Sequence, residues 1–172
     1  MRFFLAGIMQ GSHLGAELHN QNYREQLKVL LLQYFPGSDV YDPLADHRES
    51  LDYDDTTGRG VFYRHNRMCR EVDVVLAFVP EASMGTAIEM WEAHEHGRGI
   101  VITISPLTHN WAIKYCSHAV FPDVAALQSE LESGRLAEHI AKLLAAKRQQ
   151  VRESPLDNGK PTPRPHKETV FP

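Results

Sequence analysis

Cysteine is scarce in this sequence, basic charge is not in excess, and long apolar runs are absent. The two cysteines, Cys69 and Cys116, are too few for a disulfide framework, which favours a reduced, cytoplasmic setting. The apolar run over residues 2–8 is shorter than a signal sequence or a membrane span requires, and no longer run follows it. A formal net charge of -4 is unusual for proteins that coat nucleic acid. We therefore expect neither a membrane nor a nucleic-acid polymer as a partner.

The apolar residues are numerous enough for one core, but they are unevenly distributed along the chain. Of the 172 residues, 42% are hydrophobic, which suits a single domain of ordinary size. Residues 154–172 contain five prolines and few apolar side chains, so they cannot bury enough surface to offset the entropy lost on ordering. We expect an α/β domain over residues 1–150 and a Pro-rich flexible tail over residues 151–172.

Predicted strands and helices alternate along the domain. The predicted strands are residues 2–8, 39–42, 73–79, 100–105 and 118–121. The predicted helices are residues 16–34, 61–72, 84–96, 110–115, and a region that follows Asp123, is interrupted at Gly134 and is most regular over residues 136–149. Alternation of this kind predicts a parallel sheet with right-handed crossovers. We expect a flavodoxin- or Rossmann-like five-stranded sheet of order 2-1-3-4-5, flanked by helices.

Residues 44–60 form a long polar insertion in this pattern. Five acidic residues lie between Asp46 and Asp55. A stretch of this length without predicted structure in a compact domain is either functional or mobile.

The predicted strand order places a ligand site before any single residue is considered. In a sheet of order 2-1-3-4-5 the switch point lies between strands 1 and 3, and ligands bind beyond the carboxyl ends of the strands. The loops over residues 7–15 and 80–85 therefore meet at one crevice. From the first loop we take as candidate substrate-binding residues Gly7, Met9, Gly11, Ser12 and His13.

The second loop leads into a helix whose first residues suit an anion. The amides of Met84, Gly85 and Thr86 have no partner within the helix, and the Ser83 hydroxyl precedes them, so together they can hold a phosphate. In the alternative interpretation Ser83 only caps the helix and Gly85 only permits tight packing.

Glu89 follows Ser83 by six residues, about one and two-thirds helical turns. Its carboxylate can reach an electron-poor atom deeper in the crevice, and the anomeric carbon of a sugar is such an atom when its base leaves. The alternative is a surface carboxylate paired with nearby cations.

A leaving base needs a proton or a hydrogen bond. His65 and Asn66 lie in the helix that precedes strand 3, and His13 is a second candidate donor; the alternative is a surface or capping histidine. His94 and His96 are two residues apart on a helix and face different directions, so we expect no metal, and we expect no cofactor.

Four segments together resemble the nucleoside 2-deoxyribosyltransferase superfamily, including its branch of N-glycosidases that hydrolyse nucleoside 5′-monophosphates. The resemblance covers roughly residues 2–145. The segments that carry it are Phe-Phe-Leu-Ala-Gly at 3–7, Tyr-Asp-Pro at 41–43, Asp-Val-Val-Leu-Ala at 73–77 and Ser-Met-Gly-Thr-Ala-Ile-Glu at 83–89. It implies a small nucleoside or nucleotide as the ligand and a homodimer or a higher homo-oligomer as the assembly.

The resemblance also implies residue roles. Glu89 matches the catalytic nucleophile of the family, and Ser83 matches the serine of the phosphate-recognising branch. Asp42, in the second segment, is taken as a substrate-binding residue. His65 occupies a position where relatives often carry an aspartate that helps to protonate the base. Glu89 and His65 are therefore the candidate catalytic residues.

Several activities are compatible with these residues. The first hypothesis is an N-glycosidase that cleaves a (deoxy)nucleoside 5′-monophosphate into free base and sugar phosphate. The alternatives are a nucleoside 2-deoxyribosyltransferase that exchanges bases, and a nucleotide-sensing module without chemistry. A phosphoribohydrolase of the cytokinin-activating type ranks lower, because the two-glycine lead-in of that family is missing before Gly85.

Overall fold

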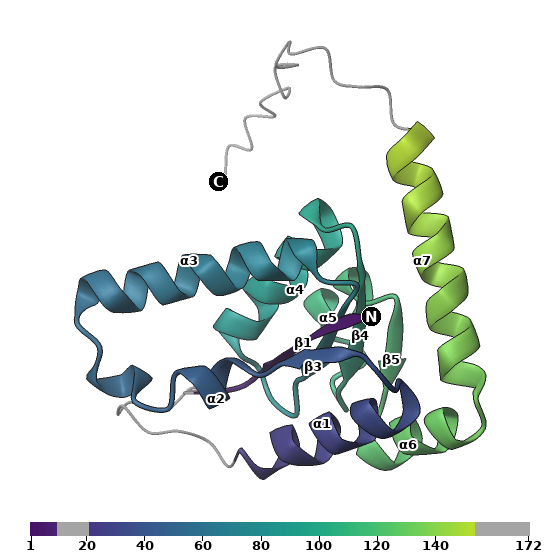
Figure 1. The fold of residues 1–172 in the computed structure, drawn as a ribbon, viewed down its shortest axis with the longest axis horizontal. Coiled ribbons are helices and arrows are strands. Elements are labelled where there is room, and N and C mark those ends of the chain that lie inside the picture. The colour runs from purple at the N-terminus through teal and green to yellow at the C-terminus, as the bar shows by residue number, and fades with distance from the viewer. Residues whose placement is uncertain (10–20, 154–172) are drawn as a thin grey trace, which may run out of the picture.

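A computed structural model describes residues 1–9 and 21–153 of the chain, with side chains up to residue 149. Its centre is a five-stranded, wholly parallel sheet of order β2-β1-β3-β4-β5. The strands are β1 (Arg2–Gly7), β2 (Asp39–Tyr41), β3 (Val74–Phe78), β4 (Ile100–Ile104) and β5 (Ala119–Phe121). The predicted α/β fold and strand order are confirmed, and Figure 1 shows the sheet between its helices.

The described helices follow the strands in the alternation that the sequence predicts. They are α1 (Asn22–Tyr34), α2 (Pro43–Asp46), α3 (Asp55–Glu71), α4 (Met84–His96), α5 (Trp111–Cys116), α6 (Val124–Glu132) and α7 (Arg135–Glu153). Gly134, with φ 74°, separates α6 from α7, because the left-handed conformation between them favours glycine. The start of the helix predicted from residue 16, the remainder of the loop over 7–15, and residues 154–172 of the predicted tail lie outside the described residues.

The polar insertion expected over residues 44–60 is largely helical, which corrects that expectation. It contains α2, a short 3-10 turn η1 (Ser50–Asp52) and the beginning of α3, which starts at Asp55 rather than at residue 61. The Asp54 carboxylate accepts a hydrogen bond from the Thr57 amide at 2.7 Å and so caps the helix. Only three residues of α3 are buried, so its first turns lack the apolar period on which the helix prediction relied.

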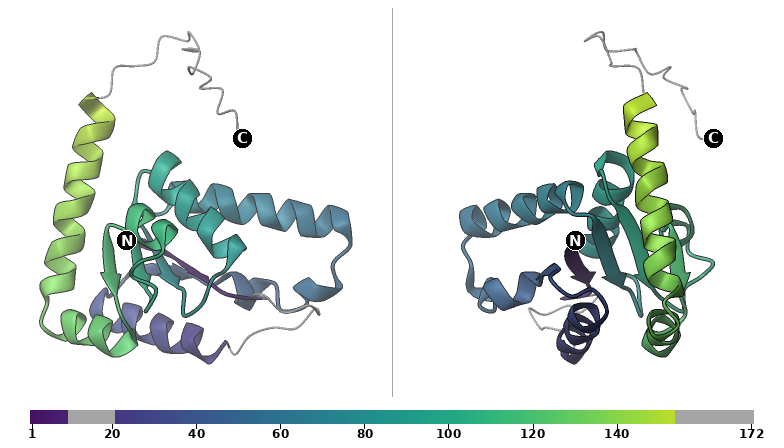
Figure 2. Two further views of the ribbon diagram at one scale, coloured as in Figure 1. Left: turned by 180° about the vertical axis from the view of Figure 1, so that it is seen from behind. Right: turned by 45° about the vertical axis from the view of Figure 1, so that its right-hand side comes forward.

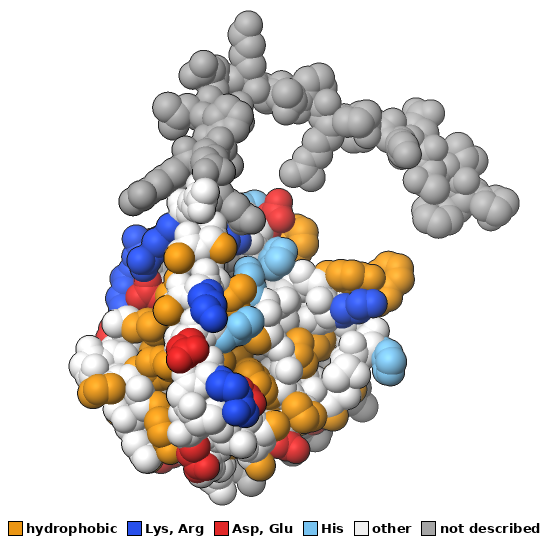
Figure 3. All heavy atoms as spheres, turned by 90° about the vertical axis from the view of Figure 1, so that its right-hand side faces the viewer, with side chains coloured by type: hydrophobic (Ala, Val, Ile, Leu, Met, Phe, Trp, Pro, Cys, Tyr) orange, Lys and Arg blue, Asp and Glu red, His pale blue; other side chains and the backbone are white. Residues whose placement is uncertain are grey.

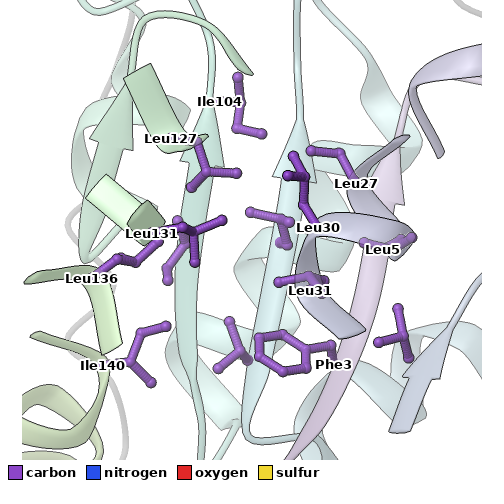
Figure 4. Close-up of a cluster of buried hydrophobic side chains, with 14 of the residues drawn as sticks. Phe3, Leu5, Leu27, Leu30, Leu31, Ile104, Leu127, Leu131, Leu136 and Ile140 are labelled. Carbon is purple, nitrogen blue, oxygen red and sulfur yellow. The ribbon is translucent and has the colours of Figure 1, made fainter. Parts of the chain in front are cut away.

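Alternate residues of the strands point to opposite faces of the sheet and pack into two separate hydrophobic cores. Phe3 and Leu5 of β1 face the first core, which α1, α6 and α7 cover, as Figure 4 shows. Phe4 and Ala6 face the second core, under α3, α4 and α5. Burying a large apolar side chain contributes about 1.5–3 kcal/mol, so both faces hold the sheet rigid. Figure 2 shows the two helical layers from behind and after a turn of 45°.

This layering produces the switch point. The chain leaves β1 toward α1 on one face of the sheet and leaves β3 toward α4 on the other face. Because β1 and β3 are neighbours, the two connections diverge and leave a crevice beyond the carboxyl ends of these strands.

The described surface has mixed character. In Figure 3 basic, acidic and hydrophobic side chains alternate along α7, and neither sign of charge dominates this face. Among the described residues, no helix has both the length and the hydropathy needed to cross a bilayer.

Candidate active site

A cavity of about 400 Å³ lies at the switch point. One wall is the start of α4, and the base is the end of β1; these contribute Ser83, Met84, Gly85, Thr86, Glu89, Gly7 and Met9. A second wall comes from the segment between α2 and the middle of α3; it contributes His47, Ser50, Tyr53, Gly58, Val61, Phe62 and His65.

The cavity thus gathers most of the candidate residues that the structure describes. Asp42 and Asn66 do not line it. The Asn66 side chain donates from Nδ2 to the Phe62 carbonyl at 3.0 Å within α3. Three further candidates, Gly11, Ser12 and His13, lie outside the described residues.

The first turn of α4 is open toward the cavity. Ser83 caps the helix, and its Oγ accepts hydrogen bonds from the Thr86 amide at 3.4 Å and the Thr86 hydroxyl at 3.0 Å. A Cβ added to Gly85 would meet no protein atom within 4 Å, so tight packing does not explain this glycine. The amides at a helix start have no intrahelical acceptor, and here they adjoin open space that an anion can enter.

Gly7 has a different reason to be glycine. A Cβ at this position would overlap the ring of Tyr23, which packs against the end of β1 and stacks on Phe78 with ring centroids 4.2 Å apart. The absent side chain therefore allows α1 to approach the base of the cavity.

Glu89 is half-buried on the same wall. Burial raises the pKa of its carboxyl to about 8, and the positive charge of Arg24 opposes part of this rise. Desolvation disfavours the charged form, so the free cavity holds the carboxyl mainly protonated at neutral pH. A perturbed carboxyl in a cavity is a common mark of a functional site.

Arg24 is a central residue that sequence reasoning missed. It is 2% exposed and donates from Nη1 to the Leu5 carbonyl and to Asp42 Oδ1, each at 3.0 Å. Its Nη2 also donates to the Gly7 carbonyl at 3.2 Å. The guanidinium therefore ties α1 to the end of β1. The sequence does contain a signal, because Arg24 shares a helical face with Leu27 and Leu31.

Asp42 has a structural position beneath the cavity. Besides the ion pair with Arg24, its Oδ1 accepts a hydrogen bond from the Leu44 amide at 3.1 Å and so caps α2. Both contacts hold the chain that leads into the second wall.

The second wall is aromatic and carries two histidines. His65 is 8% exposed, and its Nε2 shares a hydrogen bond of 3.1 Å with the Tyr41 hydroxyl. Burial, with a further contribution from His47, lowers the pKa of His65 to about 4. At neutral pH this imidazole is therefore neutral, and it can form a hydrogen bond but has no imidazolium proton to transfer.

His47, Ser50, Tyr53 and Gly58 are the part of the polar insertion that reaches the cavity, whereas none of its five carboxylates lines it. Sequence reasoning missed these four residues because it expected no structure there. The signal that could have located them is Asp54 with Thr57, since a capping residue at that point predicts an early start of α3.

A second cavity, of about 530 Å³, lies beside the first and shares Ser83 and Met84 with it. Its remaining lining is mainly apolar, and none of its side chains titrates. The larger cavity thus lacks acid-base groups, whereas Glu89 and two histidines line the smaller one. Within residues 1–9 and 21–153, no group of three or more His, Cys, Asp or Glu side chains is placed to hold a metal ion.

Comparisons with known proteins give a likeness of fold. No protein-family model matches the chain, and no curated protein matches it. Among solved structures, a 2-deoxyribosyltransferase from Bacillus psychrosaccharolyticus is 15% identical with a TM-score of 0.49, over 74% of this chain and 90% of its own. The CMP N-glycosidase BcmB from Clostridium botulinum is 18% identical with a TM-score of 0.44, over 77% of this chain and 98% of its own. At these identities and TM-scores, neither structure indicates an activity for this chain.

Proposed function

We propose that this protein is an N-glycosidase that cleaves the N-glycosidic bond of a (deoxy)nucleoside 5′-monophosphate and releases free base and sugar phosphate. The observation that carries the proposal is the arrangement of one wall of the cavity. There the uncrowded start of α4 and the perturbed carboxyl of Glu89 lie side by side.

The helix geometry relates these two features. Side chains of an α-helix point back toward its N-terminus, so the Glu89 carboxyl lies over the turn that contains Gly85 and Thr86. A phosphate bound by the first amides of α4 would therefore leave the sugar beside Glu89. The base would extend toward the aromatic wall formed by His47, Tyr53 and Phe62.

The chemistry follows from the charge that develops on the sugar. When the bond from the anomeric carbon to the base breaks, its electron pair leaves with the base, and the carbon becomes electron-poor. The reactive form is the ionised Glu89 carboxylate, whose share grows as pH approaches 8. It forms a bond to that carbon, and water then displaces the carboxylate. The overall reaction consumes one water and returns Glu89 to its starting state.

The direct test is incubation of the protein with a panel of nucleoside 5′-monophosphates, followed by liquid chromatography. Release of free base from at least one member is the expected result. Adding a second free base separates the alternatives, because a newly formed nucleotide or nucleoside would indicate a transferase. Tight binding with no product over hours would instead indicate a nucleotide-sensing module, and the proposal would be wrong.

Ser83→Ala should weaken recognition of the phosphate specifically. Losing one hydrogen bond to a charged group costs about 1.5–3 kcal/mol, so we expect KM for the monophosphate to rise at least about 10-fold. Activity on the matching nucleoside, which lacks the phosphate, should change much less. Steady-state kinetics on both substrates measures the difference.

The control for Ser83→Ala is a variant that loses the cap of a different helix, α6. Asp123 caps α6 by accepting from the Ala126 amide at 2.8 Å, away from the cavity lining. Asp123→Ala should cost a similar ~1 kcal/mol of stability without changing the ratio of activities. Equal loss of activity on nucleoside and monophosphate in Ser83→Ala would show that Ser83 does not recognise phosphate.

The homo-oligomer expected from the resemblance remains part of the proposal. Large apolar side chains are exposed on neighbouring faces of α4 and α5; they are Met84, Ile88, Trp91, Trp111 and Tyr115. Met84 is 85% and Trp111 is 77% exposed, and apolar patches of this kind mark contact surfaces. We expect the molar mass in solution to be a multiple of the 19.5 kDa of one chain. Light scattering after size-exclusion chromatography measures it, and a monomer would contradict this part.

A further inference from the structure

The aromatic wall of the cavity contains a histidine with one unused nitrogen. His47 Nδ1 shares a hydrogen bond of 3.0 Å with the Tyr53 hydroxyl, and the two rings meet edge to face at 5.8 Å. His47 Nε2 is shielded from solvent, and no hydrogen-bond partner for it exists among the described residues. His47 also lines the cavity, so a ligand that displaces the groups covering Nε2 can supply the missing partner.

A buried nitrogen without a hydrogen-bond partner lowers the stability of the folded protein, so its presence points to a partner that the site receives from a ligand. Leaving a buried donor or acceptor unsatisfied costs about 1–3 kcal/mol, and such atoms in native structures need an explanation. His47 and His65 rings lie 5.1 Å apart, and both residues line the cavity that Glu89 also lines. A base held between these walls would bring a ring nitrogen or a carbonyl oxygen toward Nε2 of His47.

His65 is less suited to give up a proton. Its Nε2 is occupied by the Tyr41 hydroxyl, and its ring is packed edge-on against Phe4 and Tyr41, with centroids 6.0 and 5.7 Å apart. These contacts position a neutral imidazole at the back of the wall. Its neighbour His47 is better suited to act as the acid, because Tyr53 anchors one nitrogen and the other has no partner among the described residues.

We propose that His47, oriented by Tyr53, is the general acid that protonates the departing nucleobase. This inference rests on the proposed N-glycosidase function and names the residue that assists the departure of the base. Tyr53 is a positioning residue, because its hydroxyl acts through Nδ1 of His47.

The step balances within one turnover. As Glu89 bonds to the anomeric carbon, the electron pair of the glycosidic bond goes to the base, and the base takes the Nε2 proton of the His47 imidazolium. Water next attacks the anomeric carbon, the bond to Glu89 breaks, and the proton lost by water returns to neutral His47. The products are free base and sugar phosphate, and both side chains end as they began.

The test compares two leaving groups on the same sugar phosphate. One substrate is the monophosphate cleaved fastest in the panel, and the other is the corresponding 4-nitrophenyl glycoside 5-phosphate, whose nitrophenolate departs without a proton. For His47→Phe we expect kcat for base release to fall about 100-fold while nitrophenolate release stays within about 3-fold of wild type. His47→Gln, which keeps a hydrogen-bond donor but has no transferable proton, should behave similarly with a smaller rise in KM.

Two further variants sharpen the comparison. Tyr53→Phe should show the same selectivity at a smaller amplitude, because the ring remains while Nδ1 loses its partner. His139→Gln is the matched control, since His139 is exposed on α7 and should leave both activities unchanged. Thermal unfolding of each variant verifies that the fold is retained.

The possible failures are distinct. If wild type releases neither base nor nitrophenolate from any substrate, the proposed function is wrong and this inference is wrong with it. If wild type releases base and His47→Phe does so equally well, only the role of His47 is wrong. An equal loss on both leaving groups, or a selective loss in His65→Gln alone, also overturns the assignment to His47.

Discussion

Glu89→Gln is expected to reduce base release by at least about 10³-fold, because a neutral amide cannot form the bond to the anomeric carbon. The side chains are similar in size, so substrate binding and fold should survive. Single-turnover assays with the best monophosphate measure the loss, and they should show it for the nitrophenyl substrate as well. Activity within tenfold of wild type would exclude Glu89 as the nucleophile.

The same variant should be more stable than wild type in alkali. A glutamate carboxyl titrates near 4.5 when unperturbed and near 8 in the folded protein, so the folded state retains its proton over a range in which the unfolded chain loses it. Below pH 4.5 the carboxyl is protonated in both states and contributes no difference. As pH rises from 4.5 to 8, only the unfolded chain releases this proton, so wild type loses stability relative to the glutamine variant over that range, and the loss levels off above 8.

We expect this difference to reach on the order of 2 kcal/mol above pH 8, since partial exposure screens the charge. Denaturant unfolding at pH 4.5 and pH 9 measures it. Glu95→Gln is the matched control, because Glu95 lies on the same helix and is exposed. A variant with the same pH dependence as wild type would show that the Glu89 carboxyl is not perturbed.

Arg24→Met is expected to destabilise the protein by about 3–5 kcal/mol, the usual cost of breaking a buried ion pair. The guanidinium is 2% exposed and bonds Asp42 together with the Leu5 and Gly7 carbonyls. Methionine fills a similar volume but removes the guanidinium donors from the Leu5 and Gly7 carbonyls and the cation from Asp42. Urea unfolding measures the loss.

A double variant tests whether the unpaired Asp42 carboxylate causes the loss of stability in Arg24→Met. Arg24→Met combined with Asp42→Leu removes the uncompensated carboxylate, so the double variant should be less unstable than the sum of the two single changes. Arg135→Met is the matched control, because Arg135 pairs with Glu130 on the surface and should cost less than about 1 kcal/mol. Equal losses for Arg24→Met and Arg135→Met would contradict a structural role for the buried pair.

The first wall of the site could be predicted from the sequence because its signals are local. The strands β1 and β3 are continuous apolar runs, and the step from β3 to Ser83 and Glu89 occupies one short stretch of chain. The strand order then places this stretch beside the end of β1. Each inference required only periodicity, a helix cap and the topology of parallel sheets.

The second wall could not be predicted in this way because its geometry depends on contacts between distant segments. His47 and Tyr53 follow α2, and Asp42, which caps α2, is held by Arg24, eighteen residues earlier in the chain. The early start of α3 was also hidden, since its first turns are exposed and have no apolar stripe. The lowered pKa of His65 follows from burial, which no spacing in the sequence reveals.

The two walls of the cavity are coupled to the core to very different degrees, and this has an evolutionary consequence. Glu89 sits on α4, whose Met90 and Ala93 are locked into the core beneath the sheet, whereas Ser50, Tyr53 and Phe62 belong to a segment with few buried side chains. Substitutions in that segment away from buried contacts cost little stability. Descendants of this protein can therefore diversify the bases they accept while the bond-breaking wall stays unchanged.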